Sequence, residues 1–195
     1  MFKPVAVPTP ARRLFLQQTG ATALSATAIA LLSGCESMAQ TKTQSANQDI
    51  NILNVALGLE HEGIAAYQLG AESGLLQKPV LETAVLFQSH HKAHRDLLVV
   101  TIEKLGGRPV QPRPMAEYAK GLKADTLKSQ ADVLILAARL ELGATNAYLG
   151  VIPALKDAEL SKVAARLAAD ETMHWTALNG VLARALPQNA LTFGA

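Results

Sequence analysis

Residues 167–178, which read LAADETMHWTAL, place two polar side chains on the apolar face of a predicted helix. Leucine and alanine recur there at steps of three and four residues, and the same steps bring Glu171 and His174 onto the apolar stripe. Residues three apart on a helix share a face, so these two side chains can offer an oxygen and a nitrogen to one point. We predict a helix over residues 157–186 that carries this pair inward.

Apolar periodicity and turn signals outline three more helices. The stripes repeat every three or four residues, whereas alternating strand patterns and Asn-Gly or Asp-Gly hairpin turns are missing from the sequence. With 49% hydrophobic but only 4% aromatic residues, the chain suits a helical core of Ala, Leu and Val. We predict an all-α fold with helices over residues 49–70, 79–106 and 129–150, and a Pro-rich connection over 107–128 with a short helical turn at 116–121.

The helices repeat in pairs. In the first and third, a Leu-Glu pair is followed by a Tyr seven residues after the Glu, which is Glu60 in one helix and Glu141 in the other. In the second and fourth, two ligand-type residues three positions apart lie on the apolar stripe, beginning at His91 and at Glu171. The chain is therefore a doubled helical hairpin, with polar residues at equivalent depth in all four helices.

This arrangement resembles the ferritin-like superfamily over residues 50–186. Di-metal members carry one Glu on each of two helices and a Glu-x-x-His pair on each of the other two, all facing the interior. The resemblance implies a ferritin-like four-helix bundle with a long crossover between the second and third helices, holding one or two divalent ions such as Fe, Mn or Zn. By motif position, the implied metal ligands are Glu60, His91, His94, Glu141, Glu171 and His174.

The second helix departs from the family pattern, because His91 stands where a Glu is expected. Three carboxylates and three imidazoles leave a two-ion site one charge unit more positive than four carboxylates and two imidazoles. More imidazole shifts the preference toward Zn or Cu and away from Fe or Mn. The register with Leu98 and Leu105 favours His91 over the adjacent His90 as the inward residue.

Two interpretations of the inward Glu and His residues follow. The first is a metal centre for oxygen or peroxide chemistry, which requires an open coordination position and a change of oxidation state that the sequence does not specify. The second is a metal-free structural bundle of the cell envelope, in which these side chains pair and fix helix register. Tyr67 and Tyr148 could bond to ligand carboxylates or act as redox side chains, but core tyrosines are commonly structural, and we favour that interpretation. Iron storage is least favoured, because a mineral shell needs many subunits.

Residues 1–35 are interpreted as an export and lipidation signal. Arg12 and Arg13 precede Leu-Phe-Leu and an uncharged stretch rich in Ala and Leu, as in twin-arginine signals. The four residues ending at Cys35 resemble a lipobox. We predict export by the twin-arginine machinery, acylation of Cys35 that attaches the protein to a membrane, and a periplasmic or cell-envelope location. The competing interpretation is ordinary cleavage after Ala39.

The remaining chain divides into three parts. We expect a flexible tether over residues 36–48, the bundle over 49–187 and a C-terminal tail over 188–195. Ser129 with Asp132 predicts a capped start for the third helix.

The charge distribution argues against nucleic acid as a partner. Three of the 18 basic residues lie in the leader, ahead of all 16 acidic residues, so 15 basic side chains remain from Cys35 onward. No basic stripe of the kind that binds phosphate backbones is present in this part of the sequence. The single cysteine, itself predicted to be acylated, excludes intrachain disulfides and thiolate metal sites.

Overall fold

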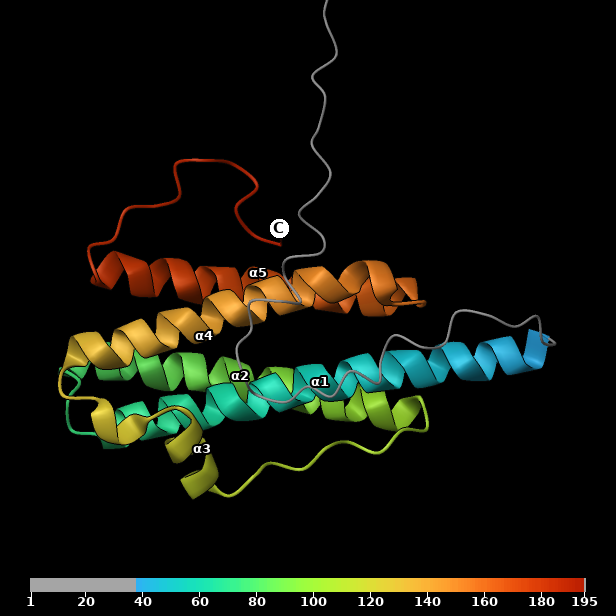
Figure 1. The fold of residues 1–195 in the computed structure, drawn as a ribbon, viewed down its shortest axis with the longest axis horizontal. Coiled ribbons are helices and arrows are strands. Elements are labelled where there is room, and N and C mark those ends of the chain that lie inside the picture. Colours follow the sequence, from blue (N-terminus) through green and yellow to red (C-terminus); the bar gives the residue numbers. More distant parts are fainter. Residues whose placement is uncertain (1–37, 195) are drawn as a thin grey trace, which may run out of the picture.

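The computed structural model describes residues 38–194, which are all-helical apart from loops and turns (Figure 1). The all-α prediction is therefore confirmed over this range. Four long helices form the bundle, and a short helix lies in the crossover between the second and the third. They are α1 (Met38–Glu72), α2 (Lys78–Lys104), α3 (Met115–Gly121), α4 (Gln130–Val151) and α5 (Ala158–Val181), with single 3-10 turns η2 (Ala124–Thr126) and η3 (Ile152–Ala154).

Two antiparallel hairpins, α1–α2 and α4–α5, pack side by side (Figure 1). The crossover runs back along the bundle from the end of α2 to α3, so that α2 and α4 point in the same direction (Figure 1). Asn54 on α1 holds this segment by donating to the carbonyl of Arg108 (3.1 Å) and accepting from the N–H of Val110 (2.8 Å). The predicted four-helix bundle with a long crossover is confirmed.

Helix α1 begins earlier than the sequence predicted. The expected flexible tether ended at residue 48, but residues 38–48 are helical. No Gly or Pro interrupts this stretch, and its Gln, Lys and Ala residues are good helix formers. Tertiary contacts also support its end, because Gln48 donates to the carbonyl of Ala154 (3.0 Å) and buried Asp49 accepts from the N–H of Lys156 (3.0 Å).

Helix α5 ends at Val181, earlier than the predicted Leu186. Ala183 adopts a left-handed conformation (φ 54°), and the N–H groups of Ala183 and Arg184 donate back to Gly180 (3.1 Å) and Asn179 (2.9 Å). This pair of bonds is a common helix ending. Residues 183–186 are exposed, so further helix would bury no apolar face.

The remaining element boundaries agree closely with the sequence. Helix α2 ends through the same kind of bond pair, with Gly106 left-handed (φ 80°) where glycine had predicted the stop. The start of α4 is capped as expected, because the Ser129 hydroxyl accepts from the N–H of Asp132 (3.2 Å).

Arg12, Arg13 and Cys35 lie outside the described residues, so export and acylation stay predictions. Within residues 38–194, no helix is both long and apolar enough to cross a membrane.

Two apolar clusters fill the bundle on either side of a polar layer. One cluster contains Leu57, Leu98, Ile102 and Leu167. The other contains Tyr67, Phe87, Leu134 and Leu178. The Glu/His layer, defined as Glu60, His91, His94, Glu141, Glu171 and His174, lies between them along all four long helices.

Candidate metal centre

The structure buries all six side chains of the Glu/His layer, with none more than 6% exposed. Each belongs to the apolar stripe of its helix, which the bundle turns toward the interior. Their nitrogen and oxygen atoms fall into two overlapping groups, each with atoms within 4.8 Å of one another. The sequence named the right residues to meet in space, and their role as metal ligands stays a prediction.

The first group joins Glu60 on α1 to the two inward histidines of α2 and to Glu171. Nδ1 of His91 lies 2.7 Å from Oε2 of Glu60 and 3.7 Å from Oε1 of Glu171. Nδ1 of His94 lies 3.2 Å from the same Glu171 oxygen and 3.7 Å from Oε2 of Glu60. Two nitrogens and two oxygens therefore surround one point.

The second group joins Glu141 on α4 to His174 and again to Glu171 and His91. Nε2 of His91 lies 3.3 Å from Oε1 of Glu141. Nδ1 of His174 lies 3.5 Å from that oxygen and 3.2 Å from Oε2 of Glu171. His91 and Glu171 thus face both groups, each through two different atoms, and we call them the spanning residues.

Each hairpin steadies the Glu of the other through a tyrosine. Tyr67 on α1 donates to Oε1 of Glu141 on α4, and Tyr148 on α4 donates to Oε1 of Glu60 on α1. Burial and the charge of the carboxylate it binds raise the pKa of each tyrosine well above its usual value. The two phenols therefore stay protonated and act as fixed hydrogen-bond donors to ligand-type carboxylates, which is the alternative to a purely structural role that the sequence left open.

Each hairpin also supplies a partner for the outward nitrogen of the other's histidine. Nε2 of His94 lies 3.1 Å from Oδ2 of Asp170, and Nε2 of His174 lies 2.9 Å from Nδ1 of His90. Such partners fix ring orientation and tune the basicity of a metal-ligating histidine. Sequence reasoning missed both roles, although each partner directly precedes the spanning residue of its own helix.

The sequence profile of a ferritin-like domain matches residues 48–184. The chain belongs to the ferritin-like domain family. Two solved structures share this ferritin-like fold. A conserved hypothetical protein from Mycobacterium tuberculosis is 23% identical, with a TM-score of 0.59, and the match covers 69% of this chain and 97% of that one. A dodecameric thioferritin, the bacterioferritin-related protein of Bacteroides fragilis, is 18% identical, with a TM-score of 0.60 and coverages of 74% and 93%. No curated protein is similar enough to match the chain.

Two carboxyl groups of this ferritin-like site are held ionised by histidine. Burial alone would raise the pKa of Glu60, but hydrogen bonds and positive charge from His91 and His94 outweigh it and lower the pKa to about 2. The pKa of Glu141 is also lowered, because histidine hydrogen bonds overcome the effect of its burial. Burial raises the pKa of Glu171, and the adjacent Glu141 adds to that shift. The third carboxyl is therefore the one that most readily keeps a proton.

The histidines respond in the opposite direction. Burial alone would lower the pKa of His94, but hydrogen bonds to Glu171 and Glu60 raise it to about 10. The pKa values of His91 and His174 are raised by the carboxylates beside them, again against the effect of burial. Protons on these rings therefore hold the carboxylates together in the protein alone. A metal ion must displace them, which couples metal binding to proton release.

The donor set fits a divalent transition metal. Nitrogen and oxygen ligands bind such ions at about 2.0–2.2 Å, so two ligands of one ion lie at most about 4.4 Å apart. The longest separations in each group therefore need only small side-chain adjustments. Oε2 of Glu141 is buried without a hydrogen-bond partner among residues 38–194. A proton shared with Glu171, a water molecule or a cation would satisfy this oxygen.

A pocket of about 270 Å³ reaches this centre between α1 and α4. We call it the side pocket, and small residues keep it open, among them Gly63 and Gly143. A Cβ atom at Gly63 would lie 3.1 Å from the His91 ring, closer than is usual for such contacts. His91 and Glu141 form the inner wall, so a small molecule in the side pocket meets one atom group directly.

Proposed function

We propose that this ferritin-like protein is an exported, lipid-anchored metalloprotein that binds one or two divalent transition-metal ions, Fe, Mn or Zn, for reactions with oxygen or peroxide. The observation that carries the proposal is the pair of overlapping nitrogen and oxygen groups in the buried core. The unpartnered Oε2 of Glu141 supports it, because a buried carboxylate oxygen is costly to leave unsatisfied.

The six residues of the Glu/His layer form two equivalent ligand sets, one for each ion. Glu60 and His94 would hold one ion, and Glu141 and His174 the other, while Glu171 offers one oxygen to each. When bound, such ions supply Lewis acidity and, for Fe or Mn, a change of oxidation state. The protein's own contribution is to orient the ligands, exclude bulk water with the two apolar clusters and keep the tyrosine donors in place.

The side pocket supports small reactants such as dioxygen or hydrogen peroxide. It leads to His91 and Glu141 through a passage lined by small and apolar residues together with the charged side chains of Glu62 and Arg139. Its volume of about 270 Å³ leaves ample room for dioxygen or hydrogen peroxide. We propose that this passage supplies the open position that the chemistry requires.

The envelope location rests on the sequence. We expect Arg12→Lys together with Arg13→Lys to retain precursor in the cytoplasm, because the paired arginines carry the export step. Cys35→Ser should release or mis-process the protein, because the acyl chains attach to this sulfur. Cell fractionation with immunoblotting checks both variants, and normal membrane attachment of Cys35→Ser would refute the lipoprotein proposal.

A second candidate is a metal-free structural bundle. The observation favouring it is that His91, His94 and His174 all find carboxylate partners in the protein alone. Such pairs fix helix register without any metal, although a buried ion pair is weak support for stability.

Metal content separates the two candidates. We propose to measure Fe, Mn and Zn by mass spectrometry in protein purified from its native envelope, comparing wild type with Glu171→Ala and with Glu103→Ala, an exposed α2 residue outside the layer. The metalloprotein proposal expects stoichiometric metal in wild type and Glu103→Ala and little in Glu171→Ala. Equally low metal in all three would leave the structural bundle.

A further inference from the structure

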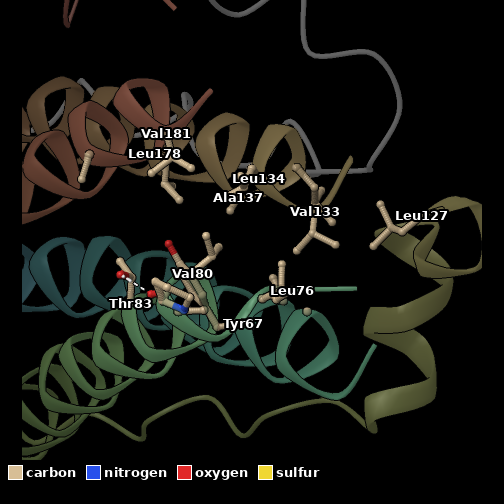
Figure 2. Close-up of a pocket in the computed structure, with 16 residues that line it drawn as sticks. Tyr67, Leu76, Val80, Thr83, Leu127, Val133, Leu134, Ala137, Leu178 and Val181 are labelled. Carbon is tan, nitrogen blue, oxygen red and sulfur yellow. Dashed lines mark hydrogen bonds between the residues drawn. The ribbon is translucent and has the colours of Figure 1, made fainter. Parts of the chain in front are cut away.

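A second pocket lies at the end of the bundle where α1 meets α2, and we call it the end pocket. Figure 2 shows its lining, with side chains of α1 and α2 on one side, side chains of α4 and α5 opposite, and Leu127 of the crossover at one end. Its volume is about 250 Å³. Its lining includes none of the Glu/His layer, and it shares only Tyr67 with the side pocket.

The end pocket lies between the two hairpins. Helices pack closely within each hairpin, whereas α2 and α5 make few contacts with each other. Small residues face the gap, including Gly70, Ala84 and Ala137. Interiors normally close such gaps, because unfilled apolar space forfeits dispersion contacts.

The pocket has an open mouth and a buried floor. Pro79 on α2 and Ala177 and Val181 on α5 line it and are exposed, so the mouth opens between these two helices. Tyr67 and Leu178 line it and are buried. The hydroxyl of Tyr67 donates to Glu141, so the floor is one hydrogen bond away from the Glu/His layer.

The lining selects an uncharged occupant. None of the 16 described lining residues carries a charge, and only Tyr67 and Thr83 carry side-chain polar atoms. The Thr83 hydroxyl already donates to the carbonyl of Pro79 (3.0 Å). A charged group inside would therefore lose its hydration without gaining a partner.

The volume sets the size of the occupant. An apolar cavity of about 150 Å³ accepts benzene, so by proportion 250 Å³ holds about ten carbon atoms. We propose that the end pocket binds a single-chain uncharged amphiphile, with an alkyl chain of about ten carbons against Tyr67 and a polar head at the mouth. This proposal does not depend on metal at the Glu/His layer.

Binding of primary alcohols from hexanol to tetradecanol, measured by calorimetry below their solubility limits, tests the proposal. The protein is the full chain carrying Cys35→Ser, so that no acyl chain competes for the pocket. We expect affinity to rise about fourfold per methylene, as burial of each CH₂ predicts, and to level off near decanol. An affinity that keeps rising through tetradecanol would indicate surface adsorption and overturn the proposal.

Filling variants provide the matched control. Ala137→Phe and Ala177→Phe each place a ring in the end pocket from a different helix, whereas Ala131→Phe places one on the exposed face of α4. Loss of about 1.4 kcal/mol of contact weakens binding tenfold. We expect decanol to bind at least about tenfold more weakly to both filling variants, while Ala131→Phe binds as wild type does.

Circular dichroism verifies that each variant is folded. If one filling variant does not fold, the other filling variant alone is enough for the test. Unchanged decanol affinity in a folded filling variant would overturn the proposal. So would an affinity that falls as protein concentration rises, because a second copy of the chain would then occupy the mouth.

Discussion

The two hairpins of the bundle place their inward polar residues at equivalent positions, but the residue types differ at two adjacent positions. Hairpin α1–α2 carries His90-His91 where hairpin α4–α5 carries Asp170-Glu171. In each hairpin the first residue holds the outward nitrogen of the other hairpin's histidine, and the second faces both atom groups. The repeat therefore fixes the positions, and the residue types at these two positions decide what each hairpin contributes.

The difference matters most at the spanning residues. Glu171 can give one oxygen to each of two ions in a single protonation state, and its two oxygens already face the two groups. His91 can give a nitrogen to each ion only after losing both ring protons, and its pKa is raised by the hydrogen bonds it makes to Glu141 and Glu60 despite its burial. We therefore expect Glu171 to bridge and His91 to serve one ion at a time.

Breaking the bridge should have the largest effect. Glu171→Ala removes an oxygen from both atom groups, so we expect affinity for both ions to fall by more than the ten- to hundredfold that an outer partner is worth. His91→Ala should leave one ion bound, because His91 serves one ion at a time and the other group keeps the ligands that hold its ion. Calorimetric titration of the metal-free protein with Zn²⁺ checks both, and equal losses in the two variants would contradict the comparison.

Making the hairpins alike should have the next largest effect. His91→Glu gives α2 the Glu-x-x-His pair that α5 carries, and so provides a second bridging carboxylate. We expect stoichiometry to approach two ions per chain and Fe or Mn occupancy to rise relative to Zn, because imidazole is replaced by carboxylate. Mass spectrometry after reconstitution with equal mixtures of divalent ions under nitrogen measures this. An unchanged metal ratio would refute the assigned role of His91.

The metal-free protein should show a stability maximum in mildly acidic solution. The pKa of Glu60 is lowered from 4.5 to about 2, so its contribution is present above pH 4.5 and is lost as the pH falls toward 2. The pKa of His94 is raised from 6.5 to about 10, so its contribution is present below pH 6.5 and is lost as the pH rises toward 10. Urea unfolding of chelator-treated protein should therefore give its highest free energy of unfolding between about pH 4.5 and 6.5. This maximum should exceed the values toward pH 2 and toward pH 10 by about a few kcal/mol.

Two variants sharpen this test of the ion pairs. Glu60→Gln should weaken the fall on the acid side, and His94→Gln the fall on the alkaline side, because each removes one titrating partner. A free energy of unfolding that is flat from pH 3 to 9 in the wild type would show that these pairs do not form.

The outer partners should produce the smallest difference. A carboxylate raises the basicity of a ligating histidine more than a second imidazole does, so Asp170→Asn should cost about tenfold in metal affinity. His90→Gln keeps a hydrogen-bonding group beside His174, and we expect a smaller loss. Zn²⁺ titration of both variants measures the two losses of metal affinity. A larger loss in His90→Gln than in Asp170→Asn would contradict the expected ranking of the two partners.

The sequence was sufficient to predict the depth of each inward residue. Helical spacing relative to Leu98 distinguished His91 from His90, and the structure buries His91 at 3% exposure while His90 is only partly covered. The internal repeat placed Glu60 and Glu141 at the same level in their helices. Both inferences depend on position within one helix, which periodicity reports directly.

Contacts between the hairpins could not be read in the same way. Asp170 meets His94 and Tyr67 meets Glu141 only because of the direction in which one hairpin lies across the other. The early start of α1 has a similar origin, since buried Asp49 accepts a bond from Lys156, a residue distant in the chain. Such partners depend on tertiary packing. Helical periodicity in a single sequence does not report which residues of different helices meet.

Anomalous diffraction tests the bridging role of Glu171 most directly. Crystals of the metal-free protein would be soaked in Mn²⁺ or Zn²⁺, with data collected on both sides of the metal absorption edge. We expect one peak between Glu60 and His94 and a second between Glu141 and His174, with Glu171 giving one oxygen to each. Peaks only on the protein surface, with the Glu and His side chains still paired to one another, would contradict the account.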